Sequence, residues 1–105
     1  MTTYASVLTA LSDPTRRDVL ERLRQGPRSV TALAESLPVS RPAVSQHLKV
    51  LREAGLVTQE QAGTRHFYSV NPGGLVELRK YLDGFWSDVL LAFEAEVNSR
   101  KDDPT

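Results

Sequence analysis

The stretch from Ser40 to Val57, which reads SRPAVSQHLKVLREAGLV, decides the fold predicted for this chain. Ser40 is a favourable N-cap, Pro42 lies in the first turn, where a missing N–H costs nothing, and Gly55 marks the helix end. Apolar residues at helical spacing predict an inward stripe of Val44, Leu48 and Leu51. The outward face holds short, amide or cationic side chains: Arg41, Pro42, Ala43, Ser45, Gln46 and Lys49. Such a face suits a helix that enters the negatively charged groove of a nucleic acid.

The composition limits the classes of protein to consider. We expect the 105 residues to form a single domain, over 1–105, with a modest core. Thirteen Lys and Arg balance thirteen Asp and Glu, which argues against a uniformly basic surface but permits a local basic patch. The absence of cysteine excludes disulfides and cysteine-based metal sites. Without a secretion signal or an apolar run of about 18 residues, we expect a soluble, cytoplasmic protein with no membrane partner.

Three short helices are predicted before the central stretch. The first ends near Ser12, the second runs from Asp13-Pro14 to Gly26-Pro27, and the third is capped by Ser29. Their inward residues are, in order, Tyr4, Val7, Leu8 and Leu11; Val19, Leu20 and Leu23; and Val30, Leu33, Ala34 and Leu37. The third helix, a corner stiffened by Pro38 and the helix after Ser40 match the helix-turn-helix pattern, at about residues 29–54.

The residues after this pattern are β-prone. Two such runs around Gly63 predict a β-hairpin at about residues 56–70. Its packed side is expected to hold Val57, Phe67 and either Tyr68 or Val70. A hairpin that directly follows a recognition helix is the wing of a winged helix, and its tip would hold Gly63, Thr64 and Arg65. A lone arginine at such a tip can enter a narrow minor groove.

A long helix is predicted at about residues 72–99, with Asn71 as N-cap and Pro72 at its first position. Its apolar face is too wide for a monomer of this size to cover, so we interpret the excess as a dimer interface shared with the first helix. The expected interface residues are Tyr4, Val7, Leu8, Leu11, Leu82, Phe85, Trp86, Val89, Leu90 and Phe93. Gly84 either permits close helix approach or marks a kink.

Charge is divided along the chain. Basic residues outnumber acidic ones between Arg16 and Arg65, whereas acidic residues predominate from Tyr81 onward. This division would turn the dimer helices away from the phosphates of DNA. The arginines of the second helix are interpreted as a solvated face with ion pairs one turn apart.

Three segments together resemble the ArsR family of bacterial winged-helix repressors: ALSDPTRRDVLERL at 10–23, SRPAVSQHLKVLREAGLV at 40–57 and GTRHFYSV at 63–70. The resemblance covers nearly the whole chain in order. It implies a mainly α fold of α-α-α-α-β-β-α order, dimerised by its terminal helices. It also implies a transcription regulator that binds double-stranded DNA at an inverted-repeat operator, with Ser45, Gln46 and their neighbours facing the major groove.

Many members of this family sense metals, and here the sequence departs from them. The third helix has no cysteine, the last helix has no histidine, and the two histidines, His47 and His66, lie in the recognition helix and the wing. Zinc and softer metals favour thiolate or imidazole ligands. We therefore expect neither a metal site nor another cofactor, and the sequence indicates no particular effector.

Side-chain chemistry suggests a role for each residue of the outward face. Arg41 and Gln46 are candidate base readers, since arginine favours guanine and glutamine favours adenine. Ser45 and Lys49 are candidate phosphate contacts. Ser40 is first a cap, although a phosphate could also lie at this helix N-terminus. Arg52 is either another phosphate contact or a solvated cation. His47 is either a phosphate contact or a partly buried packing residue.

Three other classes of function compete with a DNA-binding regulator. The sequence contains no nucleophile elbow, phosphate-binding glycine loop or metal-hydrolase motif, so an enzyme is not expected. A winged helix that docks protein partners through its acidic, aromatic-rich last helix, without binding DNA, is one alternative. A dimerisation domain of a larger enzyme is another.

Overall fold

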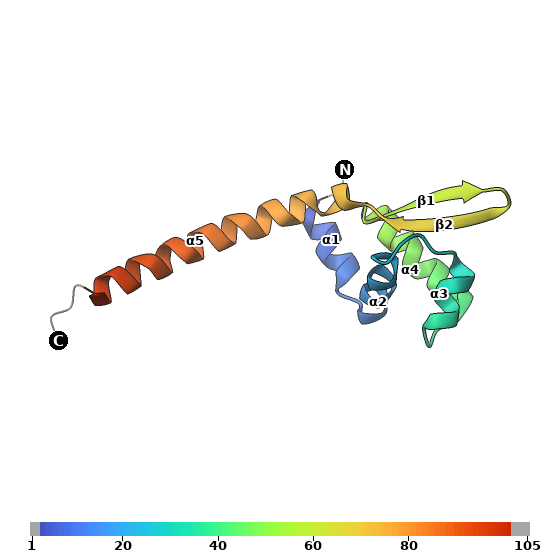
Figure 1. The fold of residues 1–105 in the computed structure, drawn as a ribbon, viewed down its shortest axis with the longest axis horizontal. Coiled ribbons are helices and arrows are strands. Elements are labelled where there is room, and N and C mark those ends of the chain that lie inside the picture. Colours follow the sequence, from blue (N-terminus) through green and yellow to red (C-terminus); the bar gives the residue numbers. More distant parts are fainter. Residues whose placement is uncertain (1–2, 102–105) are drawn as a thin grey trace.

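The computed structural model describes the backbone of residues 3–101 and the side chains of residues 3–98. Figure 1 shows a helical body, a hairpin that projects from one end of it, and a long helix that leaves in the opposite direction. The predicted order of helices and strands is confirmed. The elements are α1 (Tyr4–Leu11), α2 (Pro14–Leu23), α3 (Val30–Ser36), α4 (Arg41–Glu53), β1 (Val57–Ala62), β2 (Arg65–Val70), the 3-10 turn η1 (Pro72–Leu75) and α5 (Val76–Lys101).

Local capping signals define where the helices of the body begin. A polar side chain accepts a hydrogen bond from a backbone N–H of the first turn in each of them, which satisfies a group that the helix itself leaves free. The cap residues are Thr3, Asp13, Ser29 and Ser40. At the other end of α4, Gly55 takes a positive φ of 79°, as its predicted role as a helix stop requires.

The core lies between α1, α2, α3, α4 and the start of the hairpin. The inward stripe of α4 is confirmed, since Val44, Leu48 and Leu51 are at most 1% exposed. Within the described residues, no polar or charged side chain is buried. The core consists of Val7, Ala10, Val19, Leu23, Leu33, Leu37, Val44, Leu48, Leu51, Ala54, Leu56 and Val57.

This core corrects one part of the expected dimer interface. Val7 is fully buried within the protomer, and Leu11 packs against the same core. Tyr4 and Leu8 remain 42% and 45% exposed. The prediction was wrong for Val7 because α1 divides a single apolar side between the core and the outer surface. Helical spacing places all four residues on that side and cannot separate them.

The hairpin forms as predicted, with antiparallel pairing from Val57 opposite Val70 to Ala62 opposite Arg65. Gly63 occupies the first turn position with φ of 64°, a conformation that favours glycine. The register places Tyr68 and Val70 on the packed side, where they contact the core. The expectation for Phe67 was wrong, because alternate residues of a strand point to opposite faces and Phe67 alternates with these two.

The start of the long helix also differs from the prediction. Asn71 does not cap it; its Nδ2 donates to the carbonyl oxygen of Gly55 at 2.9 Å, and its backbone N–H donates to Leu56 at 2.8 Å. A 3-10 turn follows, and α5 begins only at Val76. A Cβ atom on Gly74 would overlap with the carbonyl oxygen of Gly55. The turn therefore packs directly on the backbone that ends α4.

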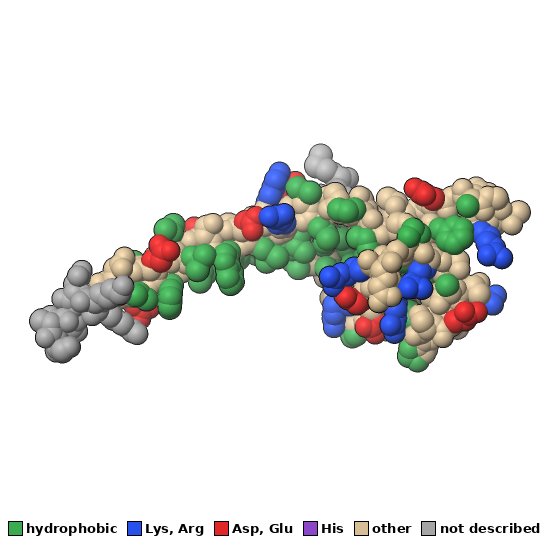
Figure 2. Space-filling view, in the orientation of Figure 1, with side chains coloured by type: hydrophobic (Ala, Val, Ile, Leu, Met, Phe, Trp, Pro, Cys, Tyr) green, Lys and Arg blue, Asp and Glu red, His purple; other side chains and the backbone are tan. Residues whose placement is uncertain are grey.

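Most of α5 has no neighbour within the protomer. Its contacts with other elements are concentrated on α1 and η1, after which it continues alone (Figure 1). Apolar side chains follow one side of it in Figure 2. Nothing in the described structure lies within 4 Å of a Cβ placed on Gly84, so no close helix approach occurs there within one protomer. Its expected interface residues, all at least 42% exposed, are Leu82, Phe85, Trp86, Val89, Leu90 and Phe93.

Candidate nucleic-acid interface

The outward face of α4 has the composition that the sequence predicts. The core residues on its other side hold the helix in one rotation, so the remaining positions face solvent. Ala43 is partly buried at the edge of this face, where its N–H donates to the Ser40 hydroxyl at 3.3 Å. The exposed positions are Ser40, Arg41, Pro42, Ser45, Gln46 and Lys49. These side chains form a continuous surface available to a ligand.

The lysines and arginines fall into two groups by their partners. Among the side chains that the structure describes, those with an intramolecular hydrogen bond or ion pair are Arg16, Arg17, Arg22, Arg24, Arg28, Arg79 and Lys80. Those without such a partner are Arg41, Lys49, Arg52 and Arg65. The cations free of protein partners thus lie on α4 and at the tip of the hairpin, the two surfaces predicted to meet DNA.

Three arginines of α2 bind carbonyls of other helices, which the expected ion pairs on its surface do not describe. Arg24, at the C-cap of α2, pairs with Glu21 at 2.7 Å, and Arg16 lies 3.8 Å from the N-cap carboxylate of Asp13. Arg22 donates to the carbonyl of Ser36 at the end of α3, at 3.3 Å. Arg16 and Arg17 donate to carbonyls of α1. These partners come from other helices, so spacing within α2 could not reveal them.

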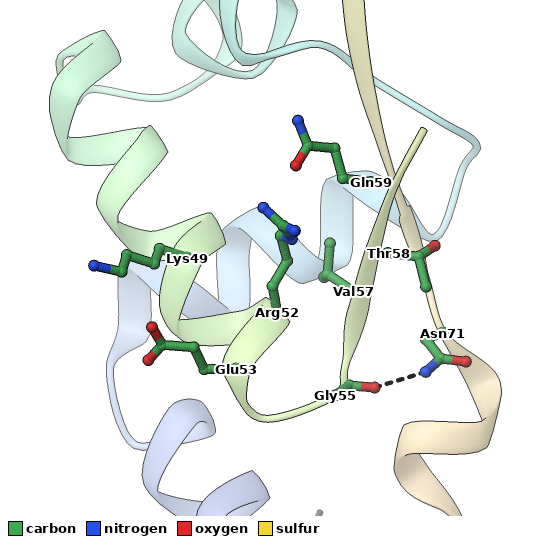
Figure 3. Close-up of a pocket in the computed structure, with 8 residues that line it drawn as sticks. All are labelled: Lys49, Arg52, Glu53, Gly55, Val57, Thr58, Gln59 and Asn71. Carbon is green, nitrogen blue, oxygen red and sulfur yellow. Dashed lines mark hydrogen bonds between the residues drawn. The ribbon is translucent and has the colours of Figure 1, made fainter. Parts of the chain in front are cut away.

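An open cleft of about 610 Å³ lies between the C-terminal half of α4 and the start of β1 (Figure 3). Arg52 and Gln59 extend into the space between helix and strand, whereas Lys49 and Glu53 point away from the hairpin. Gln59 was not predicted as a site residue. The alternation along β1 places it on the same face as Val57, and only the packing of the hairpin brings it beside α4.

The tip of the hairpin is exposed. Gly63, Thr64 and Arg65 lie there as predicted from the sequence, and Gln61 Nε2 donates to the carbonyl of Gly63 at 3.1 Å. At the base, Arg28 exchanges two backbone hydrogen bonds with Tyr68, of 3.0 and 2.8 Å. The body therefore anchors the hairpin from its β2 edge, and its tip remains free to reach a second ligand surface.

His47 differs from the other candidates on α4 because it is partly buried. Its charge acts on Asp13, whose pKa is lowered below the ordinary value of 3.8. The largest cause of that shift is the hydrogen bond from the backbone N–H of Arg16, and the charges of Arg16 and His47 act in the same direction. His47 therefore lies within electrostatic range of the N-cap of α2, and its role as a packing residue or a phosphate contact stays a prediction.

In the described part of the chain, no three side chains of His, Cys, Asp or Glu are grouped so that they could hold a metal ion. No helix there is both long and apolar enough to cross a membrane.

Comparison with known proteins identifies the family. Residues 11–60 match a family model described as a helix-turn-helix domain. The HTH-type transcriptional regulator Rv2034 of Mycobacterium tuberculosis is 51% identical over 106 residues, which cover 98% of this chain and 99% of that protein. An ArsR-like transcriptional regulator from Rhodococcus sp. RHA1 has a similar structure, with a TM-score of 0.76 and 29% identity over 97% of this chain and 94% of its own.

A third protein is described as a homodimeric winged helix-turn-helix DNA-binding domain, Mb0332 from Mycobacterium bovis. Its TM-score is 0.65 at 29% identity, over 82% of this chain and 80% of its own. The long alignment with Rv2034 and these two structures confirm the resemblance noted in the sequence. Because the family consists of regulators, the chain is not an enzyme. The chain belongs to the ArsR family of winged helix-turn-helix transcriptional regulators.

Proposed function

We propose that the protein is a homodimeric repressor that binds an inverted-repeat operator in the cytoplasm. The observation that carries this proposal is the placement of its partnerless cations. Arg41, Lys49 and Arg52 on α4, and Arg65 on the hairpin, break no intramolecular bond when they meet a phosphate or a base. Such contacts release the counterions of DNA, which is the main source of affinity for the backbone.

Within α4, the side chains divide into base readers and backbone contacts. Arg41 and Gln46 are long, exposed and able to make two hydrogen bonds to guanine and adenine, respectively. Ser45 and Lys49 contact phosphates, and Arg52 does the same at the mouth of the cleft beside β1. In this arrangement Arg65, carried by Gly63 and Thr64, enters the adjacent minor groove.

The homodimer rests on the apolar surface of α5 and on the exposed part of α1. Phe85 and Trp86 are 58% and 68% exposed, and Tyr4 and Leu8 extend the same surface. A second copy of the chain would cover these residues, in keeping with the homodimeric description of the Mycobacterium bovis domain. Two recognition helices would then reach successive major grooves about 34 Å apart. Occupation of the operator would block access of the polymerase.

Selection of bound sequences from a random DNA pool tests this function. Recovery of an inverted repeat would support both DNA binding and the symmetric dimer. Affinity should fall steeply as salt rises, because phosphate contacts release counterions. Affinity that stays constant between low and high salt would contradict the proposal. Failure to bind any DNA, together with a stable complex with another protein, would favour a docking module instead.

Single substitutions on α4 sharpen the division of roles. Gln46→Ala should cost about 1–3 kcal/mol on the operator and relax base preference at one position. Lys49→Ala should weaken operator and random DNA alike and reduce the salt slope by about 1. Lys80→Ala is the matched control, because Lys80 pairs with Glu77 on α5 at 3.6 Å, away from this surface. If Gln46→Ala and Lys49→Ala weaken operator and random DNA equally, the assignment of readers is wrong.

A further inference from the structure

The corner between α1 and α2 brings together two helix ends of opposite polarity. α1 has no basic residue in its last turn; the N–H and the hydroxyl of its C-cap Ser12 donate to the Thr9 carbonyl, and further donors to its last carbonyls come from α2. Arg16 Nε donates to the carbonyl of Ala10 at 2.7 Å, and its Nη2 donates to that of Thr9 at 3.3 Å. Arg17 Nη1 donates to the carbonyl of Leu11 at 2.7 Å. Two adjacent arginines of α2 therefore bind three successive carbonyls of α1.

Asp13 holds the same corner from the α2 side. Its Oδ1 accepts hydrogen bonds from the backbone N–H groups of Thr15 and Arg16, at 2.8 and 3.1 Å. Its Oδ2 lies 3.8 Å from Nη1 of Arg16. Burial of Val7 and Ala10 holds α1 on the core, but apolar contacts are not directional. The hydrogen bonds of the corner are directional and so define the tilt and rotation of α1.

The direction of α1 matters because α1 is one of two supports of α5. The rings of Tyr4 and Tyr81 stack with their centroids 4.3 Å apart and an interplanar angle of 7°. Tyr81 in turn contacts Phe85 edge-on, with centroids 5.5 Å apart. The other support is the η1 turn. A change in the tilt of α1 would thus change the angle between α5 and the recognition helix α4.

We propose that Arg16 and Arg17 are positioning residues that set the half-site spacing of the operator. The inference rests on the proposed function, since it requires a dimer formed through α1 and α5. In a symmetric dimer any change at the corner occurs twice. Each base pair added between two half-sites rotates one half-site relative to the other by roughly one tenth of a turn. A small change in the angle between α5 and α4 therefore alters the spacing at which both recognition helices of the dimer can bind. Base readout within each half-site is unaffected, because α4 itself is not altered.

The test compares spacing preference in the full-length chain and its variants. Selection from a random pool identifies the wild-type operator, and operators with one base pair added or removed between half-sites are then titrated. We expect the wild type to lose about tenfold in affinity per base pair of wrong spacing, near the cost of one mismatched pair. The Arg16→Gln/Arg17→Gln variant should lose about twofold or less in affinity for each base pair of wrong spacing. It should still select the same half-site sequence. Arg17→Lys leaves Arg16 intact and keeps a cationic donor at position 17, so its loss of affinity on wrong spacing should fall between those of the wild type and the double variant.

Controls keep a structural effect apart from a positioning effect. Arg24→Gln removes an exposed arginine at the C-cap of α2, whose side chain pairs only with Glu21, and this variant should retain the wild-type spacing preference. If the double variant fails to fold, Arg17→Gln alone provides the test, because Arg17 is exposed and its loss leaves the core intact. Circular dichroism and thermal unfolding establish which case applies.

The outcomes distinguish this inference from the proposed function. A wild-type protein that selects no inverted repeat would refute the proposed function itself. A wild-type inverted repeat, with the same spacing preference in folded variants, would overturn only the positioning role. A uniform loss of affinity on all spacings would also overturn the positioning role, and it would identify Arg16 and Arg17 as contacts to the phosphate backbone of DNA.

Discussion

The helical body with its hairpin packs most of its large apolar side chains into a core, whereas the long helix α5 leaves most of its own exposed. In the body, Leu33, Leu48 and Leu51 are at most 1% exposed, and none of the described polar side chains is left buried. On α5, Phe85, Trp86 and Phe93 are 58–68% exposed. The body has a core of its own, whereas these three side chains of α5 stay exposed in the protomer and can be buried only against another molecule. Folding of the reading surface is therefore a property of the protomer, and the pairing of two such surfaces depends on concentration.

Placing a charge on the apolar face of α5 should have the largest effect. Phe85→Glu puts a carboxylate into the proposed interface, twice in a symmetric dimer. Because burying an unpaired charge is strongly unfavourable, we expect the dimer dissociation constant to rise by about 1000-fold or more. Sedimentation velocity over a concentration series measures this change.

Leu91→Glu is the control for that substitution. Leu91 is also exposed, at 65%, but it follows Phe85 by six residues and lies roughly 240° around the helix, at about 100° per residue. The Leu91→Glu variant should remain a dimer. If both variants dimerise like the wild type, α5 is not the interface.

Truncation of a buried leucine in the body should have the next largest effect. Leu51→Ala removes a fully buried side chain and should lower the free energy of unfolding by about 2–5 kcal/mol. Leu91→Ala removes the same atoms from an exposed position and should change it by less than about 0.5 kcal/mol. Urea denaturation at one protein concentration compares the two. Equal losses would mean that the difference between body and α5 is not one of packing.

A substitution where η1 packs on the end of α4, between the body and α5, should have a smaller and position-specific effect on stability. Gly74→Ala places a Cβ against the backbone of Gly55 and should cost about 1–3 kcal/mol of stability, as other overpacked sites do. Gly73→Ala serves as its neighbour control, because its nearest atom would be Asn71 Oδ1 at 3.4 Å. Thermal unfolding of the two variants should therefore differ clearly. Similar melting temperatures would show that η1 can move off α4 at little cost.

The smallest predicted effect is a pH dependence at the α1–α2 corner. The folded state lowers the pKa of Asp13, chiefly through the hydrogen bond from the Arg16 backbone N–H. Its contribution to stability is thus complete above the ordinary value of 3.8 and is lost as the pH falls through the lower, folded-state pKa. The wild type should lose more stability on acidification than Asp13→Asn, as measured by urea midpoints at neutral and acidic pH. Parallel losses would contradict this assignment.

The accuracy of the sequence prediction depended on the range of the interaction involved. Ser40 caps α4, and Gly55 ends it, because caps and stops involve residues only a few positions apart. Phe67 was misplaced because the sequence does not show which face of a hairpin meets the body. Asn71 was misassigned because its partner, Gly55, lies 16 positions away in the chain. The same limit concealed the bonds from the arginines of α2 to α1.

The sequence by itself therefore determined the order of helices and strands, the outward composition of α4 and the membership of a family. These properties follow from periodicity and capping, which are local. Only the tertiary structure decided that Val7 belongs to the core, that Arg16 and Arg17 bind the end of α1, and that Arg41, Lys49, Arg52 and Arg65 lack protein partners. The physical reason is that hydrogen bonds and burial join residues that are distant in sequence, so the role of a cation depends on which helix end lies beside it.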